Sequence, residues 1–294
     1  MSSEIKAGVI GLGAMGAPMA RHLALAGLLS AIWNRSPEKA IALGTELQVP
    51  VAGSPAELAQ LSNTILICVS GDNDLAEVID GLLPGLAENS IVIDTSTVSP
   101  ATAVEMADRL AAKNVQFVDA PVSGGVEGAI KGTLSVMAGG DSADMLRIQP
   151  VLNALSSTVT HMGAVGSGQA AKAVNQVIVG GVAEAVCEAL ALSEKLNLPS
   201  QRLLSVLGAG AAGSWFLEHR GQSMLEDRFE KGFKLALLLK DLKIIRDLAR
   251  ELDIPMSTVD NAINEYEQLV EAGDGDNDIS GLIRLKRKPA KGSG

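Results

Sequence analysis

The sequence predicts a two-domain protein, in which an α/β domain with a mainly parallel sheet precedes an all-helical domain. Its 294 residues are long for one hydrophobic core and sufficient for two. Up to about residue 164, short apolar runs alternate with helical patterns, which is typical of βαβ units. Strand signals then disappear. We therefore expect domains at residues 1–164 and 165–285, followed by a mobile basic tail at residues 286–294.

Six short apolar runs predict the strands of the first domain. They are residues 6–13, 30–35, 64–70, 90–96, 115–123 and 132–140. Hydrophobic residues make up 47% of the chain and aromatic residues only 2%. We therefore expect an aliphatic core, which is typical of parallel sheets that are covered on both faces.

Apolar spacing and capping signals predict the helices. The expected helices are residues 15–27, 36–47, 99–114, 169–198, 199–210, 233–252 and 255–273. Gly27 is suited to end the first helix, and Ser36 followed by Pro37 is suited to begin the second. The helix at residues 169–198, about 40 Å long at the usual rise per residue, would link the two domains.

Composition argues against several classes of protein. The net charge of −10 disfavours a nucleic-acid surface, which needs clustered positive charge. We see no secretory signal at the N-terminus and no run of about 18 uninterrupted apolar residues, so we expect a cytoplasmic protein without a membrane span. Cys68 and Cys187 lie in apolar surroundings and read as buried thiols, and the cysteines and histidines show no metal-ligand spacing.

Residues 11–16, with the sequence GLGAMG, match the G-x-G-x-x-G pattern between a predicted strand and a predicted helix. Gly11 would permit the tight turn, Gly13 the approach of a pyrophosphate, and Gly16 the close packing of helix on strand. The backbone of the loop, including Leu12, Ala14 and Met15, would surround the diphosphate at the helix N-terminus. This context predicts a Rossmann-type domain that binds a dinucleotide.

The end of the second predicted strand bears on the choice between NAD and NADP. An NAD site usually has an acidic residue there for the ribose hydroxyls, but this chain has Asn34, followed by Arg35 and Ser36. A guanidinium suits a 2′-phosphate, and the sequence shows no carboxylate at this position to repel it. We expect NADP(H) to be preferred, with NAD(H) possible if Arg35 is only a surface cation and Asn34 binds a plain ribose.

Two further motifs carry polar residues suited to chemistry. Ser123 precedes Gly124 and Gly125 at the end of a predicted strand, where its hydroxyl and the glycine N–H groups could bind a carboxylate. Lys172 and Asn175 lie three residues apart and so on one face of the long helix. An ammonium placed beside a carbonyl can stabilise the oxyanion that forms on reduction and deliver a proton to it.

These motifs, together with LLLKDLKI near residue 240, resemble those of the β-hydroxyacid dehydrogenase family, which includes 3-hydroxyisobutyrate dehydrogenases and tartronate semialdehyde reductases. The resemblance extends from Gly8 to about Leu285. It implies a Rossmann-like domain joined by a long interdomain helix to a helical substrate and dimerisation domain. The activity it implies is the interconversion of a short β-hydroxy acid and its semialdehyde with a nicotinamide cofactor.

The resemblance also implies roles for single residues. Lys172 would be the catalytic acid and base, Asn175 would bind substrate and orient the lysine, and Ser123 would bind the substrate carboxylate. Lys240 would line the cofactor and substrate site, where its charge, together with burial, would lower the pKa of Lys172.

Other residues are implied to lie around the cofactor or the substrate. Ser96 and Thr97 would lie near the nicotinamide ribose, and Val69 and Ser70 would flank the adenosine. Residues 214–216 are expected to form a loop, from which Trp215 could shape the substrate pocket, alone or across a dimer; ordinary helix packing is an equal alternative. His161 and His219 lie in no motif and are not expected to act as bases.

Two other functions are open alternatives. An imine reductase would share the two-domain layout and the Asn-Arg stretch, but these enzymes generally use Asp or Tyr in place of Lys172. A non-catalytic dimerisation module would have lost this lysine. The substrate among short hydroxy acids is left open, since one methylene in a pocket is worth only about 1–3 kcal/mol, and a homodimer or homotetramer is expected.

Overall fold

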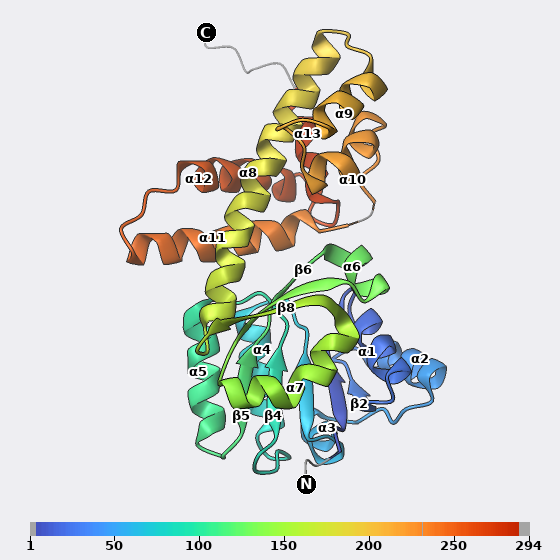
Figure 1. Cartoon of the computed structure of the whole chain (residues 1–294), viewed down its shortest axis with the longest axis vertical. Helices are drawn as coiled ribbons and strands as arrows, with labels where there is room; N and C mark the ends of the chain where they lie inside the picture. Colours follow the sequence, from blue (N-terminus) through green and yellow to red (C-terminus); the bar gives the residue numbers. More distant parts are fainter. Residues whose placement is uncertain (1–3, 231, 288–294) are drawn as a thin grey trace. The chain divides into compact units, whose positions relative to one another are not determined.

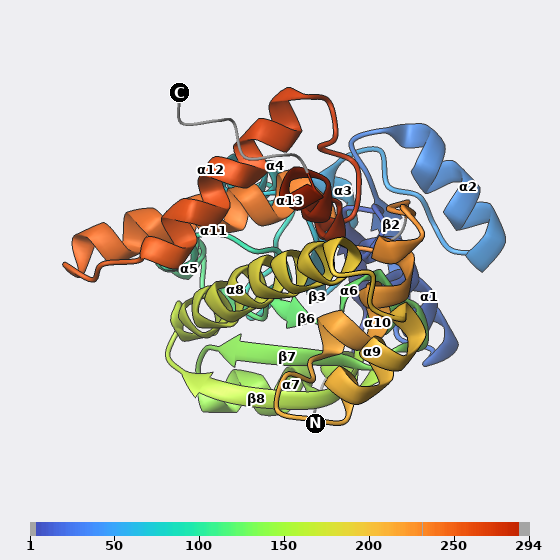
Figure 2. The same cartoon turned by 90° about the horizontal axis from the view of Figure 1, so that it is seen from above.

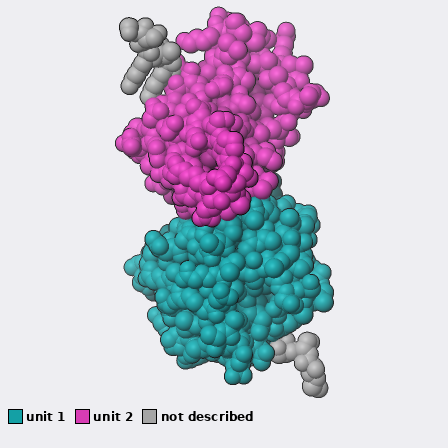
Figure 3. Space-filling model, turned by 90° about the vertical axis from the view of Figure 1, so that its left-hand side faces the viewer, with its two compact units in different colours: residues 1–172 teal, residues 173–294 magenta. Residues whose placement is uncertain are grey.

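The computed structural model describes residues 4–230 and 232–287. Its internal contacts divide the chain into two compact units, residues 1–172 and residues 173–294, which Figure 3 shows in different colours. The first unit is an α/β domain and the second is all-helical, as the sequence predicts.

The sheet of the first unit has eight strands. They are β1 (Ala7–Ile10), β2 (Leu29–Trp33), β3 (Thr64–Ile67), β4 (Ile91–Asp94), β5 (Gln116–Asp119), β6 (Val122–Ser123), β7 (Leu134–Gly139) and β8 (Ser156–Gly163). The order is β2-β1-β3-β4-β5-β7-β6, and β8 lies beside β7 (Figure 2). Strands β1 to β5 are parallel, whereas β7 is antiparallel to β5 and β6. The six predicted runs all contain strands, but β6 is a separate short strand and β8 was not predicted.

Seven helices belong entirely to the described part of the first unit (Figure 1). They are α1 (Gly16–Leu25), α2 (Pro37–Leu47), α3 (Pro55–Leu61), α4 (Asp72–Leu82), α5 (Pro100–Ala111), α6 (Gly125–Lys131) and α7 (Ser142–Leu155). The predicted caps are confirmed, because Ser36 is the N-cap of α2 and Gly27, with φ of 70°, follows the end of α1.

Alternation along the strands builds a core on each face of this sheet. Val9 and Leu66 pack into the cluster that contains residues of α1, α2 and α7, while Ile10 and Ile65 pack into the cluster with α3, α4 and α5. All four side chains are fully buried. Period-two alternation with both faces apolar is what a sheet covered by two layers of helices requires.

The second unit is built around the long helix α8 (Ser167–Lys195), whose first residues belong to the first unit. The other elements are α9 (Ser200–Gly208), α10 (Trp215–Leu225), α11 (Leu235–Glu251), α12 (Ser257–Glu271), the 3₁₀-helix η1 (Ile279–Leu282) and α13 (Ile283–Arg287). Their core contains Cys187, Leu238, Leu242 and Tyr266, all fully buried. Cys68, in the first unit, is half-buried rather than fully buried as expected. Burial raises the pKa of the Cys68 thiol to about 11 and raises that of Cys187 further, so neither cysteine is expected to be reactive.

By length and composition alone, α8 could cross a membrane: an 18-residue window has a mean hydropathy of 1.5. This is weak evidence, because the core helix of a globular domain passes the same test. Here Ala183, Cys187 and Leu190 on α8 are fully buried in the core of the second unit.

Two local expectations are wrong. Residues 214–216 do not form a loop: Ser214 is the N-cap of α10, where its side chain accepts a hydrogen bond from the Leu217 N–H, and the helix begins at Trp215. The tail expected at residues 286–294 does not begin at residue 286, because Lys286 and Arg287 belong to α13. The rest of the expected tail lies outside the described residues.

Candidate functional site

Parallel pairing brings the carboxyl ends of the first five strands to one edge of the sheet. Ile10 pairs with Trp33 and Ile67, and Asp94 pairs with Ile67 and Asp119. Ligands of open α/β sheets bind outside this edge. The predicted cofactor residues of the first unit follow these strand ends: residues 11–16 after β1, 34–36 after β2, Val69 and Ser70 after β3, and Ser96 and Thr97 after β4.

The three positions of the G-x-G-x-x-G loop after β1 favour glycine for different structural reasons. Gly11 has φ of 90°, and a Cβ there would overlap the carbonyl oxygen of Cys68. A Cβ on Gly16 would overlap the carbonyl oxygen of Gly11, so this residue lets α1 pack against the turn. A Cβ on Gly13 would meet no atom within 4 Å. Gly13 therefore has no packing reason to be glycine, which fits the close approach of a pyrophosphate.

Asn34, just after the end of β2, is hydrogen-bonded to the glycine loop that follows β1. Its Oδ1 accepts a hydrogen bond from the Leu12 N–H at 2.8 Å, and its Nδ2 donates to the Ser36 carbonyl at 3.0 Å. The Gly11 N–H donates to the Trp33 carbonyl at 3.1 Å. The Ala17 N–H already donates to the Gly13 carbonyl at 3.1 Å, and Pro18 has no N–H. An anion would therefore be held by N–H groups of residues 13–16, which precede the first intrahelical donors, rather than by Gly11 or Leu12.

Arg35 lies beside two carboxylates that are distant from it in the sequence. Its Nη1 is 2.9 Å from Asp74 Oδ1 and 3.8 Å from Glu77 Oε2, both on α4. The inference that no carboxylate lies at this position is therefore wrong, because residues about 40 positions away in the sequence are brought there by the fold. The Arg35 side chain is nevertheless 71% exposed, so its guanidinium is accessible to a ligand.

The loops after β3 and β4 are tied together. The Val69 N–H donates to Ser96 Oγ at 2.9 Å, and the Ser96 N–H donates to Asp94 Oδ1 at 3.0 Å. Ser96 is only 3% exposed, whereas Ser70 is exposed and Thr97 half-buried. Ser96 thus holds the loop that contains Val69 and is not itself a surface for ligand.

Ser123 ends β6, where it pairs with Ser135 of β7. Gly124 and Gly125 follow with φ of 127° and 62°, a conformation that favours glycine. The half-buried Ser123 side chain therefore lies where the edge strand β6 meets the start of α6.

Lys172 is a buried lysine, only 7% exposed, one turn into α8. Buried ammonium groups are rare unless they are paired or functional. Asn175, on the next turn of α8, belongs to the second unit. There it takes part in a series of side-chain hydrogen bonds. Its Nδ2 donates to Gln176 Oε1 at 2.8 Å, and Gln176 Nε2 donates to Asp241 Oδ2 at 2.7 Å.

Lys240 continues this chain of contacts in the second unit. Its Nζ is 2.9 Å from Asp241 Oδ1, and Asp241 is only 3% exposed. Asp241 therefore connects two of the predicted site residues, Asn175 through Gln176 and Lys240 directly. Neither Gln176 nor Asp241 is predicted as a site residue from the sequence, although each directly follows a residue that is.

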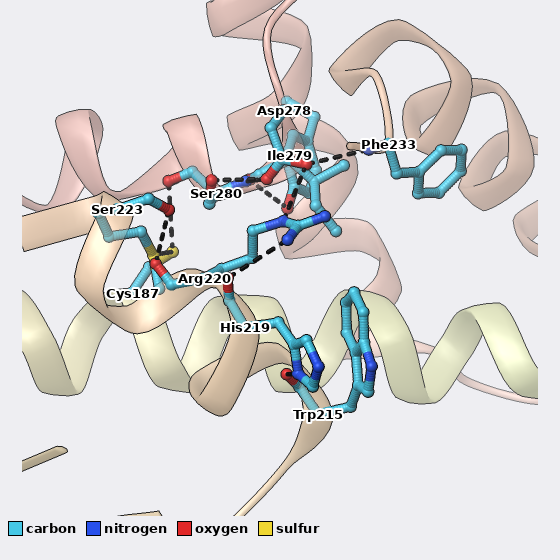
Figure 4. A network of polar contacts seen from close by, with 11 residues as sticks. Cys187, Trp215, His219, Arg220, Ser223, Phe233, Asp278, Ile279 and Ser280 are labelled. Carbon is cyan, nitrogen blue, oxygen red and sulfur yellow. Dashed lines mark hydrogen bonds and ion pairs between the residues drawn. The ribbon is translucent and has the colours of Figure 1, made fainter. Parts of the chain in front are cut away.

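Trp215 is half-exposed, and its ring stacks on that of His219, with centroids 4.2 Å apart (Figure 4). The Arg220 guanidinium lies 5.2 Å from the Trp215 ring, and this arginine is paired with the buried Asp278 at 3.3 Å. The indole is thus held on the surface of the second unit by a stacked imidazole and a cation.

The other histidine outside a motif has a structural role. His161 Nε2 lies 2.8 Å from the Gly140 carbonyl and 2.9 Å from that of Gly163. Among the described residues, no cluster of His, Cys, Asp and Glu side chains could hold a metal ion.

Family models match both parts of the chain. Residues 6–164 match the NAD-binding domain of 6-phosphogluconate dehydrogenase. Residues 166–286 match the domain described as NAD-binding of NADP-dependent 3-hydroxyisobutyrate dehydrogenase. The first match alone covers more than half of the chain, and together with the second it accounts for both units of the fold.

Individual relatives agree with these models. The chain is 33% identical over 285 residues to 2-hydroxy-3-oxopropionate reductase of Escherichia coli K12, covering 95% of this chain and 96% of that protein. It resembles the crystal structure of 3-hydroxyisobutyrate dehydrogenase from Salmonella typhimurium with a TM-score of 0.86 and 32% identity, over 96% of this chain and 99% of that one. It also resembles Psf3 in complex with NADP+ and 2-OPP, with a TM-score of 0.88 and 25% identity, over 95% and 99% of the two chains.

The dinucleotide loop, the polar residues of the sheet edge and of α8, and the matches over nearly the whole chain lead to one assignment. This protein belongs to the β-hydroxyacid dehydrogenase family of NAD(P)-dependent oxidoreductases.

Proposed function

We propose that this protein interconverts a short β-hydroxy acid and its semialdehyde, with NADP(H) preferred over NAD(H). The observation that carries the proposal is Lys172, a buried ammonium on the first turns of α8. Its position in a chain of this family supports a catalytic function over a structural one.

The proposed chemistry needs a proton at the substrate oxygen. The bound dinucleotide supplies the hydride. Lys172 donates a proton to the oxygen as negative charge develops there, and in the reverse direction the neutral amine removes the alcohol proton. Asn175 orients the substrate and the lysine, while Ser123, with the N–H groups of Gly124 and Gly125, binds the carboxylate.

The cofactor proposal rests on the glycine loop and on Arg35. Gly13 leaves open space where a pyrophosphate can approach, and the exposed Arg35 guanidinium suits a 2′-phosphate. Val69, Ser70 and Thr97 are proposed to complete the cofactor site from the neighbouring strand ends, and Ser96 is proposed to hold Val69 in place there. Lys240 stays a proposed contact of the cofactor. Trp215 is proposed to contact substrate.

We further propose that the enzyme is a cytoplasmic homodimer or homotetramer. Four large apolar side chains at intervals of about one or more helical turns are exposed on α8 or just after it: Val174 (65%), Ile178 (62%), Leu192 (60%) and Leu196 (59%). Exposed apolar side chains near both ends of one helix support packing against another copy. Light scattering of wild type and Ile178→Glu tests this: a smaller mass for the variant is expected, and two monomeric proteins would contradict it.

The function is tested by following NADPH and NADH oxidation at 340 nm. The panel contains tartronate semialdehyde, methylmalonate semialdehyde, succinic semialdehyde, glyoxylate and one cyclic imine. We expect a semialdehyde to react fastest, with NADPH, and Lys172→Ala to reduce kcat by about 10²–10⁴-fold while cofactor affinity is kept. A variant within about tenfold of wild type would remove Lys172 from the mechanism, and activity on the imine alone would assign the protein to the imine reductases.

A further inference from the structure

A buried polar network joins the ends of β4 and β5 to the first turn of α8. Asp119, the last residue of β5, is fully buried. Its Oδ1 accepts a hydrogen bond from the Gly166 N–H at 2.8 Å, and its Oδ2 accepts one from the Gln169 N–H at 2.8 Å. All residues of this network lie within the first unit, as does Lys172.

The Asp119 carboxylate acts as a cap supplied from a distant part of the chain. The first N–H groups of a helix have no intrahelical partners, and a negative charge beside them is favoured by the helix dipole. Burial raises the pKa of Asp119 to about 6, while the N–H groups of Gly166 and Gln169 oppose that rise. Above that pH the carboxylate is ionised, and it is then a strong acceptor for both N–H groups.

Two glycines allow this close contact between helix and sheet. A Cβ on Gly168 would lie 2.6 Å from the Asp119 carbonyl oxygen and 2.5 Å from that of Met137. A Cβ on Gly139 would lie 2.5 Å from Asp119 Oδ1. The backbone at the start of α8 therefore contacts the strand ends directly. Because Gly168 and Gly139 have no side chains, no flexible group at these two positions can adjust if the helix moves.

Gln169 fixes the same turn from its other side. Its side chain is 1% exposed. Its Nε2 donates to the Ser96 carbonyl at 2.9 Å, and its Oε1 accepts from the Val98 N–H at 3.2 Å. The loop after β4, which contains proposed cofactor residues, is thereby hydrogen-bonded to the helix that carries Lys172.

We propose that Asp119 and Gln169 are positioning residues, which together fix Lys172 relative to the ends of β4 and β5. The proposal rests on the proposed role of Lys172. Gln169 precedes Lys172 by three residues, so the two lie on successive turns of one helix face. A displacement of about 1 Å in a catalytic group can reduce the rate by about 10²-fold, so a small shift of this first turn is sufficient to impair proton transfer.

Asp119→Asn tests the carboxylate. The variant keeps the size of the side chain, but one of its two polar atoms becomes a donor that faces an N–H donor, so the first turn of α8 must move. We expect kcat to fall at least about tenfold, while the KM and Kd for NADPH stay within about threefold. Gln169→Met keeps the side-chain volume and removes both side-chain hydrogen bonds, so it is also expected to reduce kcat at least about tenfold. It provides the test if Asp119→Asn does not fold.

Asp141→Asn is the matched control. Asp141 is the N-cap of α7 in the same unit, where its carboxylate accepts a hydrogen bond from the Ala143 N–H at 2.7 Å. This variant loses a capping carboxylate without touching α8. We expect a reduced Tm and a wild-type kcat.

A double-mutant cycle separates positioning from general destabilisation. If Asp119 acts through Lys172, then Asp119→Asn should not reduce further the residual rate of Lys172→Ala, whereas independent effects would multiply. Wild-type kcat in both Asp119→Asn and Gln169→Met, or multiplying effects in the cycle, would overturn the positioning role while the proposed function stands. Full activity of Lys172→Ala alone would instead overturn the proposed function, and the positioning role with it.

Discussion

The pair of carboxylates beside Arg35 gives the sharpest prediction for cofactor choice. To bind a 2′-phosphate, the Arg35 guanidinium must give up or share its contact with Asp74, which is 2.9 Å away. An ion pair as exposed as this one contributes about 0.2–1 kcal/mol. Asp74→Asn removes that competition and a charge that repels the phosphate, so NADPH should bind about 1.4- to 5-fold more tightly, while NADH binding should not change.

The Kd values of both cofactors can be measured by fluorescence titration at low and high salt. Because exposed charges are screened by salt, the gain in NADPH affinity should shrink at high ionic strength. Asp80→Asn is the matched control, since Asp80 also lies on α4 but pairs with Arg109. Unchanged or weaker NADPH binding in Asp74→Asn, relative to the control, would refute the assignment of Arg35 to the phosphate.

Further predictions concern the glycine loop, one buried carboxyl and α10. Gly13→Ala should keep the Tm and weaken NADPH binding, because the added methyl meets only open space, whereas Gly11→Ala should lower the Tm as well; equal losses of Tm would contradict this. Burial raises the pKa of Glu184 to about 7 in the folded state, so the free energy of unfolding should fall as pH rises from about 4.5 to 7, and Glu184→Gln should flatten that slope in denaturant titrations at several pH values. Phe216→Ala, at a 7% exposed core position, should cost about 3–5 kcal/mol of stability, while Trp215→Ala should change kcat/KM with little change in Tm; the reverse pattern would exclude Trp215 from the substrate site.

The fold was predictable where a local pattern determines it. The six apolar runs and the Ser-Pro helix starts are such patterns, and strands and caps follow from them. The strand β8 was missed because all of its residues are exposed or half-buried and its sequence, SSTVTHMG, has no apolar run. The loop expected at residues 214–216 is a helix start, since Ser214 is an N-cap signal that was read as a turn.

Sequence motifs identify candidate site residues one by one, but they do not predict the contacts between residues that are distant in the sequence. The motifs identified Ser123, Lys172 and Asn175, and their roles stay predictions. Asp74 lies far from Arg35 in the sequence, and no local pattern reports that the two meet. Asp119 opens the motif that contains Ser123, yet its contact with the start of α8 depends on long-range pairing of strand and helix.

Asn34 shows how one side chain couples cofactor recognition to the shape of the loop that would hold the diphosphate. Its amide both accepts from Leu12 and donates to Ser36. An aspartate there would provide the acid that NAD sites use, but it would lose the donor and set a negative oxygen against the Ser36 carbonyl. A change of coenzyme by mutation at this position is therefore expected to need two substitutions, one that introduces the acid and one that relieves its repulsion of the Ser36 carbonyl.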